Sequence, residues 1–470
     1  MGYPFFQVDV AHPAWLIYAS LLVLAVFFRF SRLLSVRNLD IGFILSLSMA
    51  LVLTSTWGSD KMDVESISAE QPDAVVTQWS STVLLSLSVL LILRLIFDES
   101  LTRRPRLDQN LNQAGLTFLC VPAFAVLMTS VFMGEPPGGN VDAVKSGKAL
   151  LQRQAIGEHE SEAEDEQPAP TETLIAAGAS AVAQLSGGIS DATVSVDSES
   201  TSIEQTMACF LVVLAHTIII AGFVYIGRTH FNSLQLGVSM CCLYLLLPCT
   251  AFKVHELSHV LPAACLIWAV ACYRRPAVAG VLLGLACGTL FFAVFLLPLW
   301  AVFYGRRGSI KFGVSLGAVA ALALFAVAMT SSTADSFLAR LVHTTNWTVY
   351  RLFTDQLPVS SMGVGQIFLR ITLAAAFFVM LTAMTVIPRR RNLENLLADS
   401  TALVVAAQLW YPEDVGTYVL WYMPLLLLVM FRPRLDRFTP RETDDTKSAT
   451  ILKTTTTAAG GLLSGVTLNH

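Results

Sequence analysis

Charged residues are scarce in this chain. Asp, Glu, Lys and Arg make up 14% of its 470 residues, against roughly 25% in an ordinary soluble protein. Hydrophobic residues make up 54%, and the mean hydropathy is +0.62. This composition excludes an ordinary soluble enzyme and predicts an all-α integral membrane protein that has membrane lipid as a partner. The net charge is -4 and the basic residues form only short clusters, so we expect no nucleic-acid partner.

The polar segment lacks cysteine and the first apolar run lacks a cleavage site, and these two absences exclude further classes of protein. None of the 8 cysteines lies in the polar segment 134–206, and all of them fall within or beside apolar runs. This distribution excludes a secreted disulfide framework. The first apolar run begins near Trp15 and ends at a basic cluster instead of a small-residue cleavage site, so we interpret it as a permanent span and not as a signal peptide.

Long apolar runs make up most of the sequence outside the polar segments. Each run that can cross a hydrocarbon core of ~30 Å must be helical in lipid, and together the runs predict about 11 transmembrane helices. The predicted spans are 14–33, 41–57, 80–97, 114–133, 207–227, 235–252, 259–273, 312–331, 365–387, 400–411 and 417–431.

Basic clusters follow every second predicted span. Because Lys and Arg are retained on the cytoplasmic side, this alternation predicts an N-terminus outside and a C-terminus in the cytoplasm. The segments 58–79 and 134–206 are then extracytoplasmic. The clustered residues are Arg29, Arg32, Arg37, Arg103, Arg104, Arg106, Arg228, Arg274, Arg275, Arg389, Arg390, Arg391, Arg432, Arg434 and Arg437.

One segment, 277–303, does not fit this alternation. It is flanked by Arg274 and Arg275 on one side and by Arg306 and Arg307 on the other, so both of its ends favour the cytoplasm. A re-entrant hairpin satisfies both ends, and we prefer it to two short full spans.

The chain divides into four parts. Residues 1–133 form N-terminal transmembrane helices with an acidic outer loop at 58–79, and residues 207–435 form a C-terminal transmembrane bundle. The insert 134–206 has too few large apolar residues to bury a core, so we expect it to be largely disordered. Residues 436–470 are expected to form a flexible cytoplasmic tail.

The sharpest motif is His255-Glu256-Leu257-Ser258-His259, which matches the His-Glu-x-x-His zinc signature. On a continuous helix both imidazoles share a face, so they could bind one Zn²⁺ while Glu256 acts as a general base. No third ligand is evident, although a catalytic zinc ion needs three protein ligands. We therefore prefer a polar interfacial turn that contacts substrate and keep an intramembrane zinc protease as an alternative.

The acidic loop after the second span is another candidate site. Asp60 and Asp63 lie there among polar residues. Their carboxylates could act as a general base or hold a divalent cation at the membrane surface, and the alternative is a hydrated loop without a role.

Two polar residues lie inside predicted spans. His216 belongs to the span 207–227 and Gln408 to the span 400–411. Buried polarity in lipid is costly, so each side chain either lines a pathway or makes a hydrogen bond between helices.

A resemblance to a known family is carried by two stretches that cover about a fifth of the chain. The matching residues are Arg274-Arg275-Pro276, Ala279-Gly280 to Gly284-Leu285-Ala286, Pro298, Arg306-Arg307, Trp410-Tyr411-Pro412 and Tyr418 to Pro424. In this order they resemble glycosyltransferases of the GT-C type that use polyprenyl-phosphate sugars, in particular the alpha-mannosyltransferase group. The family's Lys before the hairpin Pro is absent here.

This resemblance implies sugar transfer from a lipid phosphate at the extracytoplasmic face, with Asp60 or Asp63 as the base. It also implies His255, Glu256 and His259 as acceptor or phosphate contacts. Trp410, Glu413 and Asp414 would line the cavity.

Other stretches resemble uncharacterised bacterial membrane proteins and favour a bacterial inner (plasma) membrane. They are Arg103-Arg104-Pro105 and Asn110 to Leu116. A non-enzymatic transport or scaffold protein stays open as an alternative function.

Overall fold

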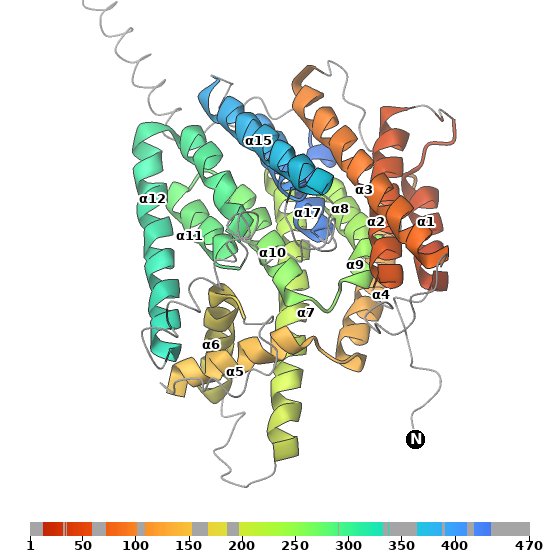
Figure 1. Ribbon diagram of the computed structural model, residues 1–470. Coiled ribbons are helices and arrows are strands. Elements are labelled where there is room, and N and C mark those ends of the chain that lie inside the picture. The colour runs from red at the N-terminus through yellow and green to blue at the C-terminus, as the bar shows by residue number, and fades with distance from the viewer. Residues whose placement is uncertain are drawn as a thin grey trace, which may run out of the picture.

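The structure, a computed structural model, is built of helices (Figure 1). It describes residues 13–31, 33, 35–58, 72–100, 109–152, 168–185, 197–289, 291–331, 337, 364–387, 391–410 and 418–433, and these residues contain no strand. The elements are α1 (Pro13–Phe27), α2 (Val36–Gly58), α3 (Pro72–Ile96), η2 (Phe97–Ser100), α4 (Gln113–Met133), α5 (Gly138–Gln152), α6 (Pro170–Leu185), α7 (Asp197–Thr229), α8 (Leu234–Leu246), α9 (Pro248–Phe252), α10 (Leu257–Ala271), α11 (Pro276–Cys287), η3 (Phe291–Leu296), α12 (Leu297–Thr330), α15 (Val364–Val386), α16 (Leu393–Ala407) and α17 (Val419–Phe431).

Three helical stretches in the described residues are long and apolar enough to cross a membrane. They are Gln113–Met133, Ile203–Thr229 and Phe292–Thr330. Shorter apolar helices accompany them: Trp15–Phe27, Thr82–Ile96, Leu234–Leu246, Leu257–Ala271, Pro276–Cys287, Ile371–Val386 and Val419–Phe431. The all-helical class is therefore confirmed for this part of the chain, whereas about 11 crossings and their orientation stay predictions.

Several helix termini that carry basic residues lie at one end of the bundle. Helix α2 begins where α1 ends, since Arg37 Nε donates a hydrogen bond of 2.8 Å to the Phe27 carbonyl. Helices α7 and α10 end side by side, with His230 Nε2 lying 2.9 Å from the Ala271 carbonyl. We call this end, which holds Arg37, Arg94, Arg274 and Arg432, the basic end.

A buried ionic network joins four helices at the basic end. Arg94 of α3 lies 3.3 Å from Asp40 of α2 and 2.6 Å from Asp98 of η2. Arg432, after α17, pairs with Asp98 and lies 3.7 Å from Glu394 of α16. The Arg432 side chain is only 1% exposed. Because buried charges are costly unless paired, this network fixes α2, α3, α16 and α17 relative to one another.

The segment after α10 folds back on itself. Helix α11 leaves the basic end, η3 turns the chain, and the first part of α12 returns. The ring of Tyr273, just before this segment, lies 6.3 Å from the ring of Phe303 at its end. At Gly305, a positive φ of 69° breaks α12, and the helix then continues alongside α11. Both ends of 277–303 therefore lie at the basic end, while its depth in a bilayer stays a prediction.

The insert contains two helices, α5 and α6, in the segment that we expected to be disordered. In Figure 1 they lie at the lower end of the bundle. Their backbones touch, because a Cβ on Gly147 would lie 2.6 Å from the Ala177 nitrogen and 2.9 Å from the Ala176 Cβ. Small residues thus permit close packing without large apolar side chains. Residues 153–167 and 186–196 lie outside the described residues.

Candidate functional site

Four of the sequence-predicted site residues lie outside the described residues. They are Asp60, Asp63, Glu413 and Asp414. Their roles therefore stay predictions. The described candidates are His255, Glu256, His259 and Trp410.

The His-Glu-x-x-His motif is divided by a helix start. Helix α10 begins at Leu257, so Glu256 is its N-cap and His255 lies in the preceding turn. The His255 ring instead lies against α4, because a Cβ on Gly134 would come 2.7 Å from its Cε1 atom. The two imidazoles therefore do not share one helical face, which is the geometry that the zinc interpretation assumed.

Glu256 and its neighbours form a chain of polar contacts, which we call the polar chain: Lys253, Glu256 and His259. Lys253 Nζ lies 2.6 Å from Glu256 Oε1, and His259 Nε2 lies 2.8 Å from Glu256 Oε2. The three side chains are 16%, 28% and 12% exposed. The site therefore holds an ammonium, a carboxylate and an imidazole that a ligand can still reach.

Trp421 of α17 fixes the tautomer of His259. Its indole Nε1 donates a hydrogen bond of 3.2 Å to His259 Nδ1. An indole N–H can only donate, so Nδ1 must be unprotonated and Nε2 carries the proton that faces Glu256. Both nitrogens of His259 are thereby engaged within the protein.

The environment of Glu256 keeps its carboxyl ionised. Burial acts to raise the pKa of Glu256, but the hydrogen bond from His259 and the charge and hydrogen bond of Lys253 outweigh it, so the pKa of this carboxyl lies below its usual range. A carboxylate with so low a pKa is a weak base. Its chemistry here is therefore to accept hydrogen bonds, for example from hydroxyl groups, rather than to abstract protons.

Aromatic rings support the polar chain from one side. The Phe292 ring of η3 lies 3.6 Å from the Trp421 ring, and Tyr418 lies 5.1 Å from Trp421. All three side chains are buried. They hold His259 in place and offer no free face to a ligand, so the accessible part of the site is polar.

Asn140 of α5 holds the turn that carries the motif. Its Nδ2 donates 2.7 Å to the His255 carbonyl, and its Oδ1 accepts 3.3 Å from the Leu257 N–H. These bonds satisfy two backbone groups on either side of Glu256. Sequence reasoning missed Asn140, because it lies more than 100 residues from the turn. It also missed Lys253, although the three-residue spacing to Glu256 was visible.

Trp410 is buried, with an exposed fraction of 1%. Its ring lies 5.8 Å from Phe295, 5.5 Å from Phe377 and 6.0 Å from Phe378. In the structure it packs η3 and α15 together, and its predicted lining role is not visible in these contacts.

His216 and Gln408, which the sequence places inside predicted spans, make hydrogen bonds to other segments of the bundle. Tyr244 lies 3.0 Å from His216 Nδ1, and His216 Nε2 lies 3.1 Å from the Val254 carbonyl. Gln408 Nε2 donates 2.9 Å to Ser88 of α3. These contacts match the structural interpretation of both residues.

No metal centre is evident among the described residues. They contain no group of three or more His, Cys, Asp or Glu side chains that could hold a metal ion. A divalent cation at Asp60 and Asp63 stays a prediction, because both residues lie outside this part of the chain.

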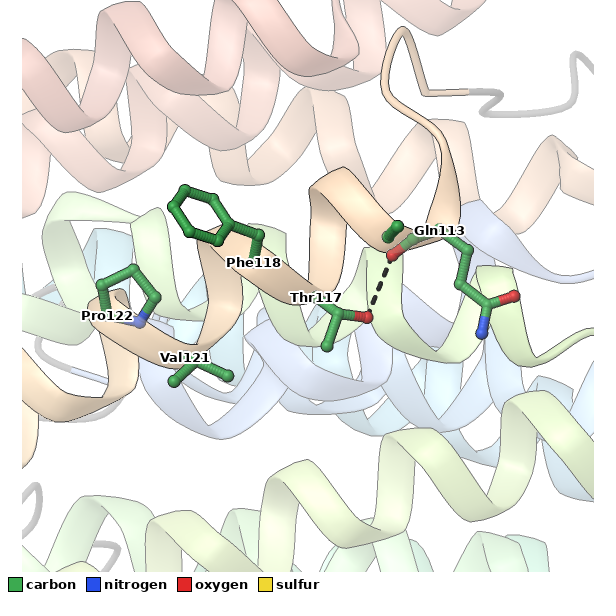
Figure 2. Close-up of a pocket in the computed structure, with 6 residues that line it drawn as sticks. Gln113, Thr117, Phe118, Val121 and Pro122 are labelled. Carbon is green, nitrogen blue, oxygen red and sulfur yellow. Dashed lines mark hydrogen bonds between the residues drawn. The ribbon is translucent and has the colours of Figure 1, made fainter.

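An apolar groove lies elsewhere, on the exposed face of α4. It has a volume of about 820 Å³ and is lined by Gln113, Ala114, Thr117, Phe118, Val121 and Pro122. Figure 2 shows these side chains along a single helix. Phe118 is 79% exposed and Val121 63%. The groove carries no ionisable group, so we place the candidate chemistry at the polar chain.

Comparisons with known proteins add no relative. No protein-family model, curated protein or solved structure matches this chain. The resemblance to GT-C transferases therefore depends on the residues quoted above.

Proposed function

We propose that the chain is a membrane-embedded glycosyltransferase of the GT-C type, or a degenerate relative of that type. It would use a lipid-linked sugar donor, with polyprenyl-phosphate mannose as the first candidate, at the extracytoplasmic face. One observation carries the proposal: a partly accessible ammonium, carboxylate and imidazole lie in contact beside the folded-back segment that bears the resemblance.

Lys253 is assigned to the donor phosphate. The family's Lys is absent from the hairpin, and Lys253 lies at the polar chain. An ammonium is a common phosphate partner as a point charge. Lys253 would stabilise the departing polyprenyl phosphate from this position.

Glu256 and His259 are assigned to sugar recognition. Glu256 stays ionised and accepts hydrogen bonds from hydroxyl groups, and His259 is held in one tautomer by Trp421. His255 would contact the acceptor or the phosphate from the preceding turn. Glu413 and Asp414 are assigned to the lining of the sugar site, as the resemblance implies.

The transfer step needs a separate base, for which we propose Asp60 or Asp63. The acceptor hydroxyl forms a bond to the anomeric carbon, the bond from that carbon to the phosphate oxygen breaks, and the hydroxyl proton passes to the carboxylate. The polyprenyl phosphate leaves with the electron pair. No metal ion is needed for this balance.

Two alternatives receive less support. The zinc protease requires two imidazoles on one helical face, whereas His255 precedes α10 and His259 is engaged by Trp421 and Glu256. A transport or scaffold protein would not need the polar chain. It is the outcome expected if no sugar is transferred.

The test follows label from radiolabelled polyprenyl-phosphate mannose into products of membranes that contain the full-length protein. The double variant Asp60→Asn, Asp63→Asn should abolish transfer. Lys253→Gln should raise KM roughly 10- to 100-fold, the effect of losing one charge-assisted contact. Lys145→Gln is the matched control, since Lys145 is 51% exposed on α5. Absent transfer by the parent, or equal transfer by all variants, contradicts the proposal.

A further inference from the structure

The start of α6 contacts the C-terminal end of α11, where the folded-back segment turns. The Thr171 N–H donates 3.2 Å to the Gly288 carbonyl. Its hydroxyl donates 2.9 Å to the Leu285 carbonyl. A Cβ on Gly288 would clash with that hydroxyl. Close approach of the two elements therefore depends on a glycine at this position.

The α5–α6 pair contacts both sides of the candidate site. On one side, Asn140 of α5 holds the turn around Glu256. On the other side, α6 holds the end of α11, shortly before Phe292, whose ring packs on Trp421. A movement of this pair would therefore displace both walls that position the polar chain.

Glu172, the next residue of α6, is buried at this contact. It is only 5% exposed. Its carboxylate accepts a hydrogen bond from the Ala169 backbone, as in a capping box. Its Oε1 atom has no hydrogen-bond partner among the described residues. Burial raises the pKa of Glu172 to about 7, although the Ala169 bond acts to lower it.

The elements packed against α6 bring no described cation to Glu172. The charges of α5 are engaged elsewhere, since Lys145 pairs with Asp142 and Lys148 with Glu204 of α7. Helix α11 has one titratable group, the thiol of Cys287, and η3 has none. Helix α12 carries no charged residue after Lys311. The capping bond alone would explain a glutamate here, but not its burial without a counter-charge in the described part of the chain.

We propose that α5 and α6 form a lid on the candidate site, latched to the folded-back segment by Thr171 and released when Glu172 loses its proton. Docking of α6 is a property of the fold, so it can be measured whether or not sugar transfer occurs. Only its effect on catalysis depends on the proposed function.

The direction of the pH dependence of α6 docking follows from the pKa of Glu172. An acid whose pKa is higher when docked than when released takes up a proton on docking. Docking is therefore strongest below pH 4.5, the ordinary value, weakens as the pH rises, and is constant above about pH 7. The full change in the docking equilibrium is roughly 300-fold, or ten raised to the difference of the two pKa values.

The test is hydrogen exchange of the full-length protein in lipid nanodiscs between pH 4.5 and pH 8. Rates are corrected for the intrinsic pH dependence, and the readout is the protection of amides in α6. The parent should lose roughly 300-fold in protection across this range. Glu172→Gln, which stays neutral, should keep high protection throughout. Glu135→Gln, the control at an exposed carboxylate outside α5 and α6, should follow the parent.

Two outcomes overturn the lid. One is a parent whose α6 protection does not change with pH. The other is a Glu172→Gln variant with the same pH dependence as the parent. If the Glu172→Gln variant fails to fold, the pH profile of the parent alone tests the lid. A flat parent profile with intact sugar transfer rejects the lid alone, and a sloped profile without transfer rejects the transferase alone.

Discussion

The ionic network at the basic end makes a strong prediction about stability. Arg432 contacts Asp98 and the Glu394 carbonyl, and its side chain is 1% exposed. Among the described residues, the network holds two guanidinium groups, of Arg94 and Arg432, and three carboxylates, of Asp40, Asp98 and Glu394. Arg432→Met keeps much of the length of the side chain and removes one of these two guanidinium groups.

The expected cost is about 3–5 kcal/mol, the range for removing one partner of a buried ion pair. The remaining bond of 2.6 Å between Arg94 and Asp98 favours the lower part of that range. The double variant Arg432→Met, Asp98→Asn removes the charge and its partner together. It should be more stable than the sum of the single effects predicts, by roughly 1–3 kcal/mol.

The assay is equilibrium unfolding of the full-length protein in mixed detergent micelles with rising dodecyl sulfate, followed by far-ultraviolet circular dichroism. The exposed Lys145→Met serves as the charge-removal control and should change stability by less than about 0.5 kcal/mol. An Arg432→Met variant as stable as the parent, or strictly additive single and double variants, would refute the reasoning.

Three further predictions concern single contacts and use the same unfolding assay. Asn140→Leu should cost about 1–3 kcal/mol, because it leaves the His255 carbonyl and the Leu257 N–H unsatisfied, and hydrogen exchange should rise around Glu256; unchanged exchange there would contradict this. Tyr244→Phe should cost about 1 kcal/mol through the lost bond to His216, and a stabilised variant would argue against that bond. Gly280→Ala should destabilise by about 1–3 kcal/mol, since its Cβ would lie 2.5 Å from the Phe312 carbonyl; a neutral effect would mean that α11 and α12 separate freely.

The sequence predicted the helical class and the shared end of the folded-back segment, because apolar runs and basic flanks are local signals. Arg274 and Arg306 mark that end through their charge and their position beside apolar runs. The sequence did not predict α5 and α6. Their composition is poor in large apolar residues, and they form by close backbone packing at Gly147 and by contacts distant in sequence, such as that of Thr171 with Gly288.

The candidate site was predicted in part. The residues His255, Glu256 and His259 were identified, but their geometry was not, because the motif alone does not reveal that α10 begins at Leu257. Asn140 and Trp421 contact the site across more than 100 residues of sequence. Such tertiary partners leave no periodic or local signal in a single sequence.

The most direct measurement of the central claim is photo-crosslinking of a polyprenyl phosphate with a photoreactive group near the phosphate, followed by mass spectrometry of the labelled peptides. We expect labelling around Lys253 and Glu256, and its loss in Lys253→Gln but not in Lys145→Gln. Labelling confined to the apolar groove at Phe118 and Val121, unchanged in both variants, would contradict it.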